Sequence, residues 1–244
     1  MKYSFWNTNR KNLDNVICDI VTEFSCDVIS IAEYGGNIKE LIVQLNKDKL
    51  TYYKVDDIAN QRVMIITKYK TSQIEDLYDA GYFTIKRIPH DALGMHIIAF
   101  VHLPSKLHVD DLTRFTTAQR LKSEIERIEE EQKCDRTIVI GDFNMNPYEA
   151  GMSGASALHC LSSREIVKKR HRTVLGKTHT MFYNPMWSFM GDVYLPDGSY
   201  FYDDSSQEVN YYWNIFDQVI IRPSLIEFFD PSTVKVLYKP VDII

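Results

Sequence analysis

The most informative stretch of the chain is TIVIGDFN, residues 137–144. Its first four residues form a continuous apolar, β-branched run, which predicts a buried β-strand that stops at Gly141. Asp142 and Asn144 follow this run two residues apart, so on an extended chain their side chains point to the same face. Polar groups at the end of a buried strand occupy the usual place for site residues in α/β proteins.

Similar apolar runs lie on both sides of this stretch and are separated by segments with helical spacing. The predicted strands cover 2–6, 27–33, 50–55, 62–69, 94–103, 137–144 and 216–223, and the predicted helices cover 10–24, 37–48 and 110–133. Strands and helices that alternate early, followed by strand-rich sequence, indicate an α/β protein with two sheets and helices packed outside them. The sequence contains no Pro- or Ser-rich linker, repeat or composition break, so we expect one domain over 1–244.

Composition excludes several classes of protein. The chain has 244 residues, of which 45% are hydrophobic and 25% charged, which excludes collagen-like and wholly disordered chains. The four cysteines contain no CxxC pair, so a zinc site or disulfide framework is not expected. Neither a signal-peptide apolar region nor a run of 18 apolar residues is present, so we expect a cytoplasmic protein that does not contact a membrane.

The net charge of −5 argues against a dedicated nucleic-acid coat protein, because such proteins are strongly basic. Contact with a polyanion would then depend on a local patch. The dense basic run is REIVKKRHR, residues 164–172, which is either such a patch or a solvated helix face.

Three further predicted strands also begin or end at polar residues. Asn7 ends the first strand, Glu33 ends the second before the turn Tyr34–Gly36, and Asp217 opens the last. Carboxylate and amide oxygens of this kind are the ligands that Mg²⁺ prefers, often beside a phosphate. The alternatives are that GDFN is a plain turn in which Asp142 bonds its own backbone, and that Glu33 is a surface charge.

Five segments resemble one known family in their order and residues. They are SFWNTN, DVISIAEYGG, IIAFVHLP, IVIGDFNMNP and FDQVIIRP, and together they span residues 4–223. The chain resembles the endonuclease/exonuclease/phosphatase superfamily, which includes deoxyribonuclease I. The resemblance implies a four-layer sandwich, with two mixed sheets packed face to face and helices on both outer sides. It also implies magnesium-dependent hydrolysis of a phosphate ester, with Mn²⁺ as a possible substitute.

The resemblance also implies roles for residues in the matching segments. Asn7 is similar to the amide that orients the metal site, and Glu33 to the principal magnesium ligand. His102 resembles the histidine that contacts the phosphate. Asp142 resembles the residue that activates the attacking water, and Asn144 the residue that holds a phosphate oxygen.

Asp217 resembles the aspartate that fixes the tautomer of a final histidine. Family members normally supply that histidine in a Ser-Asp-His segment, which this sequence lacks, and Asp242 has no histidine after it. We expect that the chain stops before that segment and is impaired in catalysis; the alternative is a naturally incomplete site that binds but hydrolyses poorly.

The sequence contains a few weaker candidates. Arg62 and His179 are candidate substrate-binding residues, whereas we expect His90 in a loop and His159 and His171 at the surface. The aromatic residues after His179 are interpreted as packing.

The predicted function is a magnesium-dependent phosphoesterase, a nuclease that hydrolyses nucleic-acid phosphodiesters by in-line attack of water. The alternatives are a small-molecule or lipid-headgroup phosphatase or phosphodiesterase, and a catalytically weak binding module. No protein partner can be inferred from the sequence.

Overall fold

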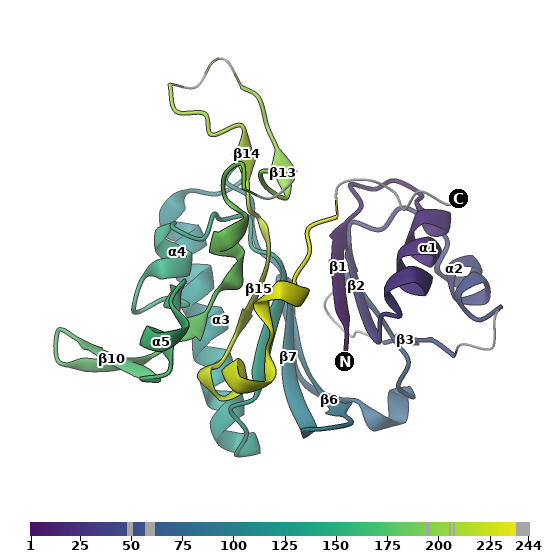
Figure 1. Ribbon diagram of the computed structural model, residues 1–244, viewed down its shortest axis with the longest axis horizontal. Helices are drawn as coiled ribbons and strands as arrows, with labels where there is room; N and C mark the ends of the chain where they lie inside the picture. Colours follow the sequence, from purple (N-terminus) through teal and green to yellow (C-terminus); the bar gives the residue numbers. More distant parts are fainter. Residues whose placement is uncertain (48–50, 57–61, 194–195, 205, 207, 238–244) are drawn as a thin grey trace. The chain divides into compact units, whose positions relative to one another are not determined.

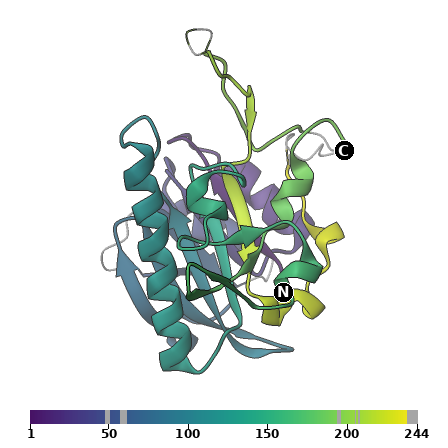
Figure 2. The same cartoon turned by 90° about the vertical axis from the view of Figure 1, so that its left-hand side faces the viewer.

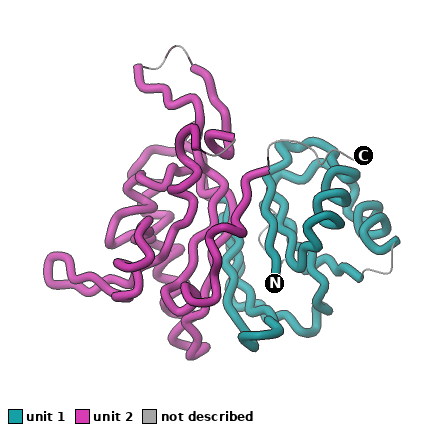
Figure 3. The backbone as a smooth tube through the Cα atoms, viewed as in Figure 1, with its two compact units in different colours: residues 1–102, 239–244 teal, residues 103–238 magenta. Residues whose placement is uncertain are grey.

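The computed structural model describes residues 1–47, 51–56, 62–193, 196–204, 206 and 208–237. Contacts between Cα atoms divide these residues into two compact units (Figure 3). The described residues up to His102 form the first unit, and those from Leu103 onward form the second. The prediction of one domain stays a prediction.

The first unit contains a four-stranded mixed sheet with the order β1-β2-β4-β3. Its strands are β1 (Tyr3–Asn7), β2 (Val28–Ala32), β3 (Tyr53–Val55) and β4 (Val63–Thr67). Strands β1 and β2 are parallel, and Asn7 is in register with Ala32. The carboxyl ends of these two strands therefore meet at the same edge of the sheet.

Helices α1 (Asp14–Phe24) and α2 (Ile38–Leu45) cover one face of this sheet. Both are amphipathic: Ile17 of α1 and Leu41 of α2 are buried in one cluster with Ile29 and Ile31 of β2. Ile29 and Ile31 share a face because side chains alternate along a strand.

An antiparallel meander of β5 (Glu75–Ala80), β6 (Phe83–His90) and β7 (Gly94–His102) completes the first unit. It packs on the sheet face opposite α1 and α2 (Figure 1). Tyr3 of β1 and His96 of β7 are hydrogen-bonded there, with 2.7 Å between the Tyr3 hydroxyl and His96 Nε2.

Strands β5 and β6 were not predicted from the sequence, and the expectation that His90 lies in a loop is wrong. His90 is the last residue of β6. The polar strand β5 carries a bulge between Asp76 and Tyr78, which breaks the alternation. In β6 the buried Lys86 is paired with Asp76, so the strand contains a charge at a core position.

The second unit contains strands in the order β8-β15-β12-β9. These are β8 (Thr137–Asp142), β9 (Cys160–Leu161), β12 (Phe182–Tyr183) and β15 (Asp217–Ile221). The long helix α3 (Asp111–Gln132) begins at the cap Asp110 and runs along this unit (Figure 2). Its buried stripe includes Ala118, Leu121, Ile125 and Ile128.

The remaining elements of the second unit are short. They are α4 (Ala150–Ser153), α5 (Arg164–Val167), β10 (His171–Val174), β11 (Lys177–Thr180), β13 (Tyr200–Phe201), β14 (Trp213–Asn214) and the 3₁₀ turns Pro185–Phe189, Pro223–Phe228 and Pro231–Thr233. One further 3₁₀ turn, Thr71–Gln73, belongs to the first unit. The predicted α/β class, with mixed sheets and outer helices, is confirmed.

One expectation and one of two open alternatives for the second unit are wrong. His159 is fully buried, with its Nδ1 2.9 Å from the carbonyl oxygen of Thr180, so it is not a surface residue. The basic run is not one helix face, because α5 ends at Val167 and the chain then enters β10 at His171. Among the described residues, no helix is both long and apolar enough to cross a membrane.

A buried ion pair ties α3 to the sheet of the second unit. Arg222 donates from Nε and Nη2 to the two carboxylate oxygens of Glu129 at 2.8 and 2.9 Å. The same guanidinium lies over the Phe182 ring, 3.9 Å from its centroid. We expect Glu129→Gln to lower the free energy of unfolding by about 3–5 kcal/mol, because it leaves the Arg222 charge buried and uncompensated.

Urea unfolding of the variant measures this loss, with Glu130→Gln on the exposed side of α3 as the matched control. A loss for Glu129→Gln no larger than that for the control contradicts the assignment.

Candidate functional site

The first unit brings together three of the predicted site residues. Asn7 ends β1 and Glu33 directly follows β2, so both lie at the shared edge of the two parallel strands. His102 ends β7, and its Nε2 lies 3.6 Å from Glu33 Oε1. These residues come from separate segments of the sequence, and the fold of the first unit alone makes them neighbours.

The backbone around Glu33 is held in an uncommon conformation. Its φ of 48° lies in the left-handed region, which is unfavourable for a residue with a Cβ. The Glu33 carbonyl accepts hydrogen bonds from Arg10 N at 2.8 Å and Thr8 Oγ1 at 2.9 Å. Gly35 lets the chain come this close, because a Cβ there would lie 2.0 Å from the Arg10 carbonyl oxygen. The turn predicted after this strand therefore fixes the backbone from which the Glu33 side chain extends.

The Glu33 carboxylate is partly exposed, at 30% of its side-chain surface, whereas the His102 side chain is only 9% exposed. Arg10 Nε lies 3.7 Å from Glu33 Oε2 on the solvent side. His102 is fixed through its backbone, since its N–H donates to the Tyr82 carbonyl at 2.9 Å. Glu33 thus supplies an accessible carboxylate, and Arg10 and His102 place two hydrogen-bond donors beside it.

The donor set at this edge fits magnesium. Mg²⁺ is usually held by one or two carboxylates and keeps several waters, and Glu33 with the Asn7 amide oxygen supplies ligands of that kind. The Asn7 Oδ1 atom also accepts from Asn9 N at 3.0 Å, which orients the amide. Within the described part of the chain, no three His, Cys, Asp or Glu side chains form a metal-binding cluster. One carboxylate and one amide oxygen would leave the remaining positions of such a cation to water.

The second unit brings the other three predicted residues together. Asp142 of β8 and Asp217 of β15 are direct partners in the antiparallel ladder. Asn144 N donates to Asp142 Oδ1 at 2.8 Å, and Asn144 Nδ2 donates to the Leu103 carbonyl at 2.9 Å. Asp142 thus forms the local turn that was the alternative interpretation of GDFN, and it also faces a second carboxylate.

The two aspartates interact electrostatically. Burial raises the pKa of Asp217 well above its usual range, and the negative charge of Asp142 raises it further, while a hydrogen bond from Ser199 opposes both effects. Two such carboxylates cannot both ionise easily, so the pair holds a proton to higher pH than an isolated aspartate does.

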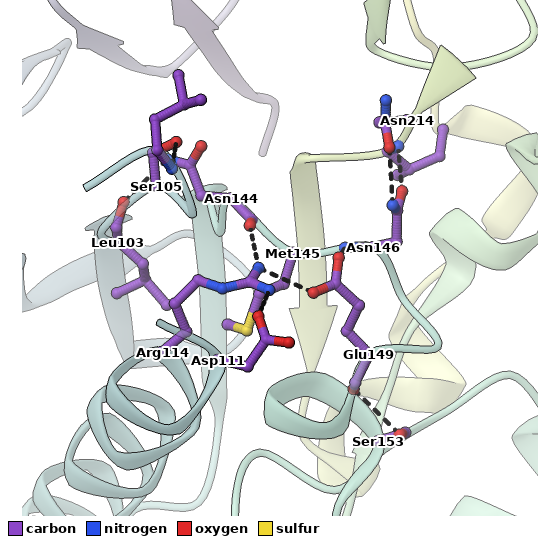
Figure 4. A network of polar contacts seen from close by, with 12 residues as sticks. Leu103, Ser105, Asp111, Arg114, Asn144, Met145, Asn146, Glu149, Ser153 and Asn214 are labelled. Carbon is purple, nitrogen blue, oxygen red and sulfur yellow. Dashed lines mark hydrogen bonds and ion pairs between the residues drawn. The ribbon is translucent and has the colours of Figure 1, made fainter. Parts of the chain in front are cut away.

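Arg114 of α3, which was not predicted as a site residue from the sequence, contacts the loop that carries Asn144 (Figure 4). Its Nη1 donates to the Asn144 carbonyl at 2.9 Å and lies 2.8 Å from Glu149 Oε2, and its Nη2 pairs with Asp111. The side chain is 6% exposed. Asn144 itself has a φ of 50°, so Arg114 holds the carbonyl of a strained residue.

A second polar network anchors the same loop. Asn146 Oδ1 accepts from Ile215 N at 2.9 Å, and its Nδ2 donates to Asn214 Oδ1 at 2.9 Å (Figure 4). Gln218 Nε2 donates to the Met145 carbonyl at 2.6 Å. The loop after β8 is thereby tied to the segment that carries Asp217.

The two weaker candidates lie in different places. Arg62 lies over the Tyr82 ring, 4.7 Å from its centroid, and Tyr82 is the residue that accepts the His102 N–H. His179 of β11 pairs with Arg172 of β10 and precedes Thr180.

The structure does not bring His179 to the Asp142–Asp217 pair. Thr180 Oγ1 accepts from Arg222 Nη1 at 2.9 Å, and Arg222 follows the end of β15 that is opposite to Asp217.

Comparison with known proteins found similar solved structures but no similar family model or curated sequence. No protein-family model matches the chain, and no curated protein sequence matches it. An endonuclease/exonuclease/phosphatase family protein from Bacteroides thetaiotaomicron aligns with a TM-score of 0.54 at 14% identity, over 91% of this chain and 82% of that one. A protein of the same family from Leptotrichia buccalis gives 0.52 at 14% identity, over 91% and 87%.

A β-hairpin deletion mutant of beta toxin from Staphylococcus aureus gives a TM-score of 0.54 at 12% identity, over 98% of this chain and 93% of that one. The chain therefore has the fold of these solved structures, two of which are endonuclease/exonuclease/phosphatase family proteins, as the sequence motifs predicted.

The raised pKa of Asp217 predicts how stability depends on pH. Above the pKa of an unfolded aspartate, about 3.9, the folded protein binds more protons than the unfolded chain, so stability falls as pH rises. We expect Asp217→Asn to remove this fall, which is at most about 1.4 kcal/mol per pH unit for one proton. Urea unfolding between pH 5 and 8 measures it. Glu23→Gln, an exposed change in α1, should keep the wild-type slope; Asp217→Asn with that same slope contradicts the assignment.

The Arg114 contacts predict a local effect on backbone dynamics. Lysine keeps the charge but lacks the planar fork that serves Asn144, Glu149 and Asp111 together. We expect Arg114→Lys to cost about 1–3 kcal/mol of stability and to speed amide hydrogen exchange in residues 143–149 more than in β8. Arg127→Lys, an exposed change on the same helix, is the control. Unchanged exchange in 143–149 would remove this role from Arg114.

Proposed function

We propose that the chain is a metal-dependent phosphoesterase that hydrolyses nucleic-acid phosphodiesters by direct attack of water on phosphorus. The observation that carries the proposal is the pairing of Glu33 with His102 at 3.6 Å, at the edge where β1 and β2 both end. An accessible carboxylate beside a buried histidine is a suitable arrangement for binding a cation and the phosphate it neutralises. The fold shared with the solved family structures supports the same chemistry at the level of reaction type.

Glu33 and Asn7 would hold Mg²⁺, with Mn²⁺ as a substitute. When bound, the ion supplies positive charge that neutralises a phosphate oxygen. His102 would donate from its ring to another phosphate oxygen and stabilise the negative charge that develops in the transition state.

The residues of the second unit would activate and orient the reactants. Asp142, as the ionised member of the carboxylate pair, would accept a proton from the attacking water as its oxygen bonds to phosphorus, while Asp217 would keep the proton that the pair shares. The bond from phosphorus to the leaving ester oxygen would break, and that oxygen would take a proton from solvent water. The Asn144 amide has two hydrogens, one of which is bonded to Leu103; the other would donate to a phosphate oxygen.

Leu103 fixes the GDFN segment within the second unit. Leu103 directly follows His102 in the sequence. Its N–H donates to the Asp142 carbonyl at 2.9 Å, and its carbonyl accepts from Asn144. Leu103 is thus bonded to both polar residues of GDFN.

The proposed function is tested by hydrolysis assays with Mg²⁺, with and without chelator. The substrates are single- and double-stranded DNA, RNA and an aryl phosphodiester. We expect chelator-sensitive cleavage of a nucleic acid. We expect Asp142→Asn to lower kcat by about 10²–10⁴, the usual contribution of a general base. Glu33→Gln should weaken Mg²⁺ binding in calorimetry, because it replaces the carboxylate ligand with a neutral amide.

Glu23→Gln serves as the control and should resemble wild type in both measurements. Cleavage of the aryl ester alone would favour a small-molecule phosphodiesterase. Near-wild-type turnover of Asp142→Asn or near-wild-type Mg²⁺ affinity of Glu33→Gln would contradict the assigned roles.

A further inference from the structure

The second unit carries a concentrated positive charge on a hairpin. Residues 164–177 contain six Lys or Arg residues and one Glu, a net charge of 6 − 1 = +5, in a chain whose net charge is −5. The segment begins with α5 and continues into β10 and the first residue of β11, and these two strands pair as an antiparallel hairpin. We call His171–Thr180, together with the preceding Lys169, the basic hairpin.

Only part of this charge is compensated by carboxylates. Lys168 lies 3.0 Å from Glu165 and 3.2 Å from Glu227, and Arg170 lies 2.8 Å from Asp135. Lys169, Arg172 and Lys177 are exposed, and no carboxylate of the described residues lies within ion-pair distance of them. The basic hairpin therefore presents three uncompensated cations to solvent, with the exposed His171 beside them.

The register of the hairpin places two of these cations on one face. Arg172 is opposite His179, and Val174 is opposite Lys177, so alternation puts all four side chains on the same side of the ribbon. Burial, Lys122 and Lys177 lower the pKa of His179, Glu126 opposes this effect, and Arg172 adds to it. Arg172 and Lys177 thus place two positive charges on this face of the ribbon.

The tip of the basic hairpin is a tight turn that is exposed to solvent. Leu175 and Gly176 have φ values of 50° and 77°, as a tight two-residue hairpin turn requires. The Leu175 side chain is fully exposed. The ribbon projects away from the rest of its unit, as the view in Figure 1 shows for the segment labelled β10.

We propose that the basic hairpin binds the sugar–phosphate backbone of a nucleic acid. A two-stranded ribbon with cations on one face matches a regular array of phosphates, and such a ribbon also fits the major groove of a duplex. A lipid surface is the less suitable partner, because one exposed leucine contributes only about 2 kcal/mol and stable anchoring needs two strong signals.

This inference rests on the proposed function and specifies its substrate. Thr180 of the basic hairpin bonds Arg222, which directly follows β15 and lies five residues along the chain from Asp217. That distance is roughly 16 Å at 3.3 Å per residue. A substrate that contacts both places must be a polymer of several nucleotides, so the hairpin selects oligonucleotides over small phosphate esters.

The experiment compares two variants with equal loss of charge. Arg172→Ser/Lys177→Ser removes two cations from the basic hairpin, whereas Lys39→Ser/Lys47→Ser removes two exposed lysines from the region of α2. Binding of labelled 20-nucleotide DNA and RNA, single- and double-stranded, is measured by anisotropy in chelator between 50 and 200 mM salt. A thermal unfolding scan checks that both variants are folded.

We expect the hairpin variant to bind at least one of these polymers about tenfold or more weakly than wild type at 50 mM salt. The slope of log K against log salt should fall by about 1.4–1.8, the value for two lost phosphate contacts. The control variant should bind like wild type. Equal weakening in both variants, or no weakening in either, overturns the proposal.

Two further outcomes separate this inference from the proposed function. If wild type binds an oligonucleotide through the hairpin but hydrolyses nothing, the inference holds and the proposed function fails. If wild type cleaves the aryl phosphodiester but binds no oligonucleotide, the inference fails. Hairpin-dependent binding to vesicles of anionic phospholipid, without binding to nucleic acid, overturns it in favour of a membrane.

Discussion

The pairing of β8 with β15 is the constraint on which the chemistry of the second unit depends. The ladder from Ile138↔Ile221 to Asp142↔Asp217 is continuous, and its buried residues include Val139, Ile140 and Ile220. Because this apolar register is fixed, the two aspartates at its end must face each other, although like charges repel. Burial and repulsion then raise the pKa of Asp217. The free energy of the apolar ladder offsets that unfavourable contact.

In the first unit, backbone geometry determines where the Glu33 carboxylate lies. Parallel strands β1 and β2 end together, and the residue after β2 adopts a left-handed conformation that the Thr8 and Arg10 hydrogen bonds hold in place. The resulting Glu33 carboxylate is accessible and lies beside a buried histidine. Accessibility suits a cation that keeps its waters, whereas the buried pair in the second unit suits a group that holds a proton. The two groups thus differ in environment as their proposed roles require.

The sequence was sufficient for the strongly apolar elements and for the residues at their ends. Strand β8 and the ends at Asn7, Glu33 and Asp217 follow from short apolar runs that stop at polar residues, and the structure has them at strand termini. Strands β5 and β6 could not be predicted in this way, because a bulge and the buried Lys86–Asp76 pair conceal their alternation.

Arg114 was missed although a signal existed. It occupies the same stripe of α3 as Ala118, Leu121 and Ile125, so a charged residue stands at an inward-facing position. What the sequence could not show is its partner, the carbonyl of Asn144, because backbone acceptors leave no trace in side-chain patterns. His159 was misjudged for a similar reason, since its partner is the Thr180 carbonyl.

The most direct test of the account is a titration of the aspartate carboxyl carbons by NMR, with Asp142 and Asp217 assigned from their single Asn variants. We expect the pair to titrate in two separated steps, with one step displaced well above the range of an ordinary aspartate. We also expect the upper step to fall part of the way toward that range in Asp142→Asn, because burial of Asp217 remains, and to disappear in Asp217→Asn. Two ordinary, independent titrations near pH 4 would show that the ladder does not couple these carboxylates, and would contradict the role proposed for Asp217.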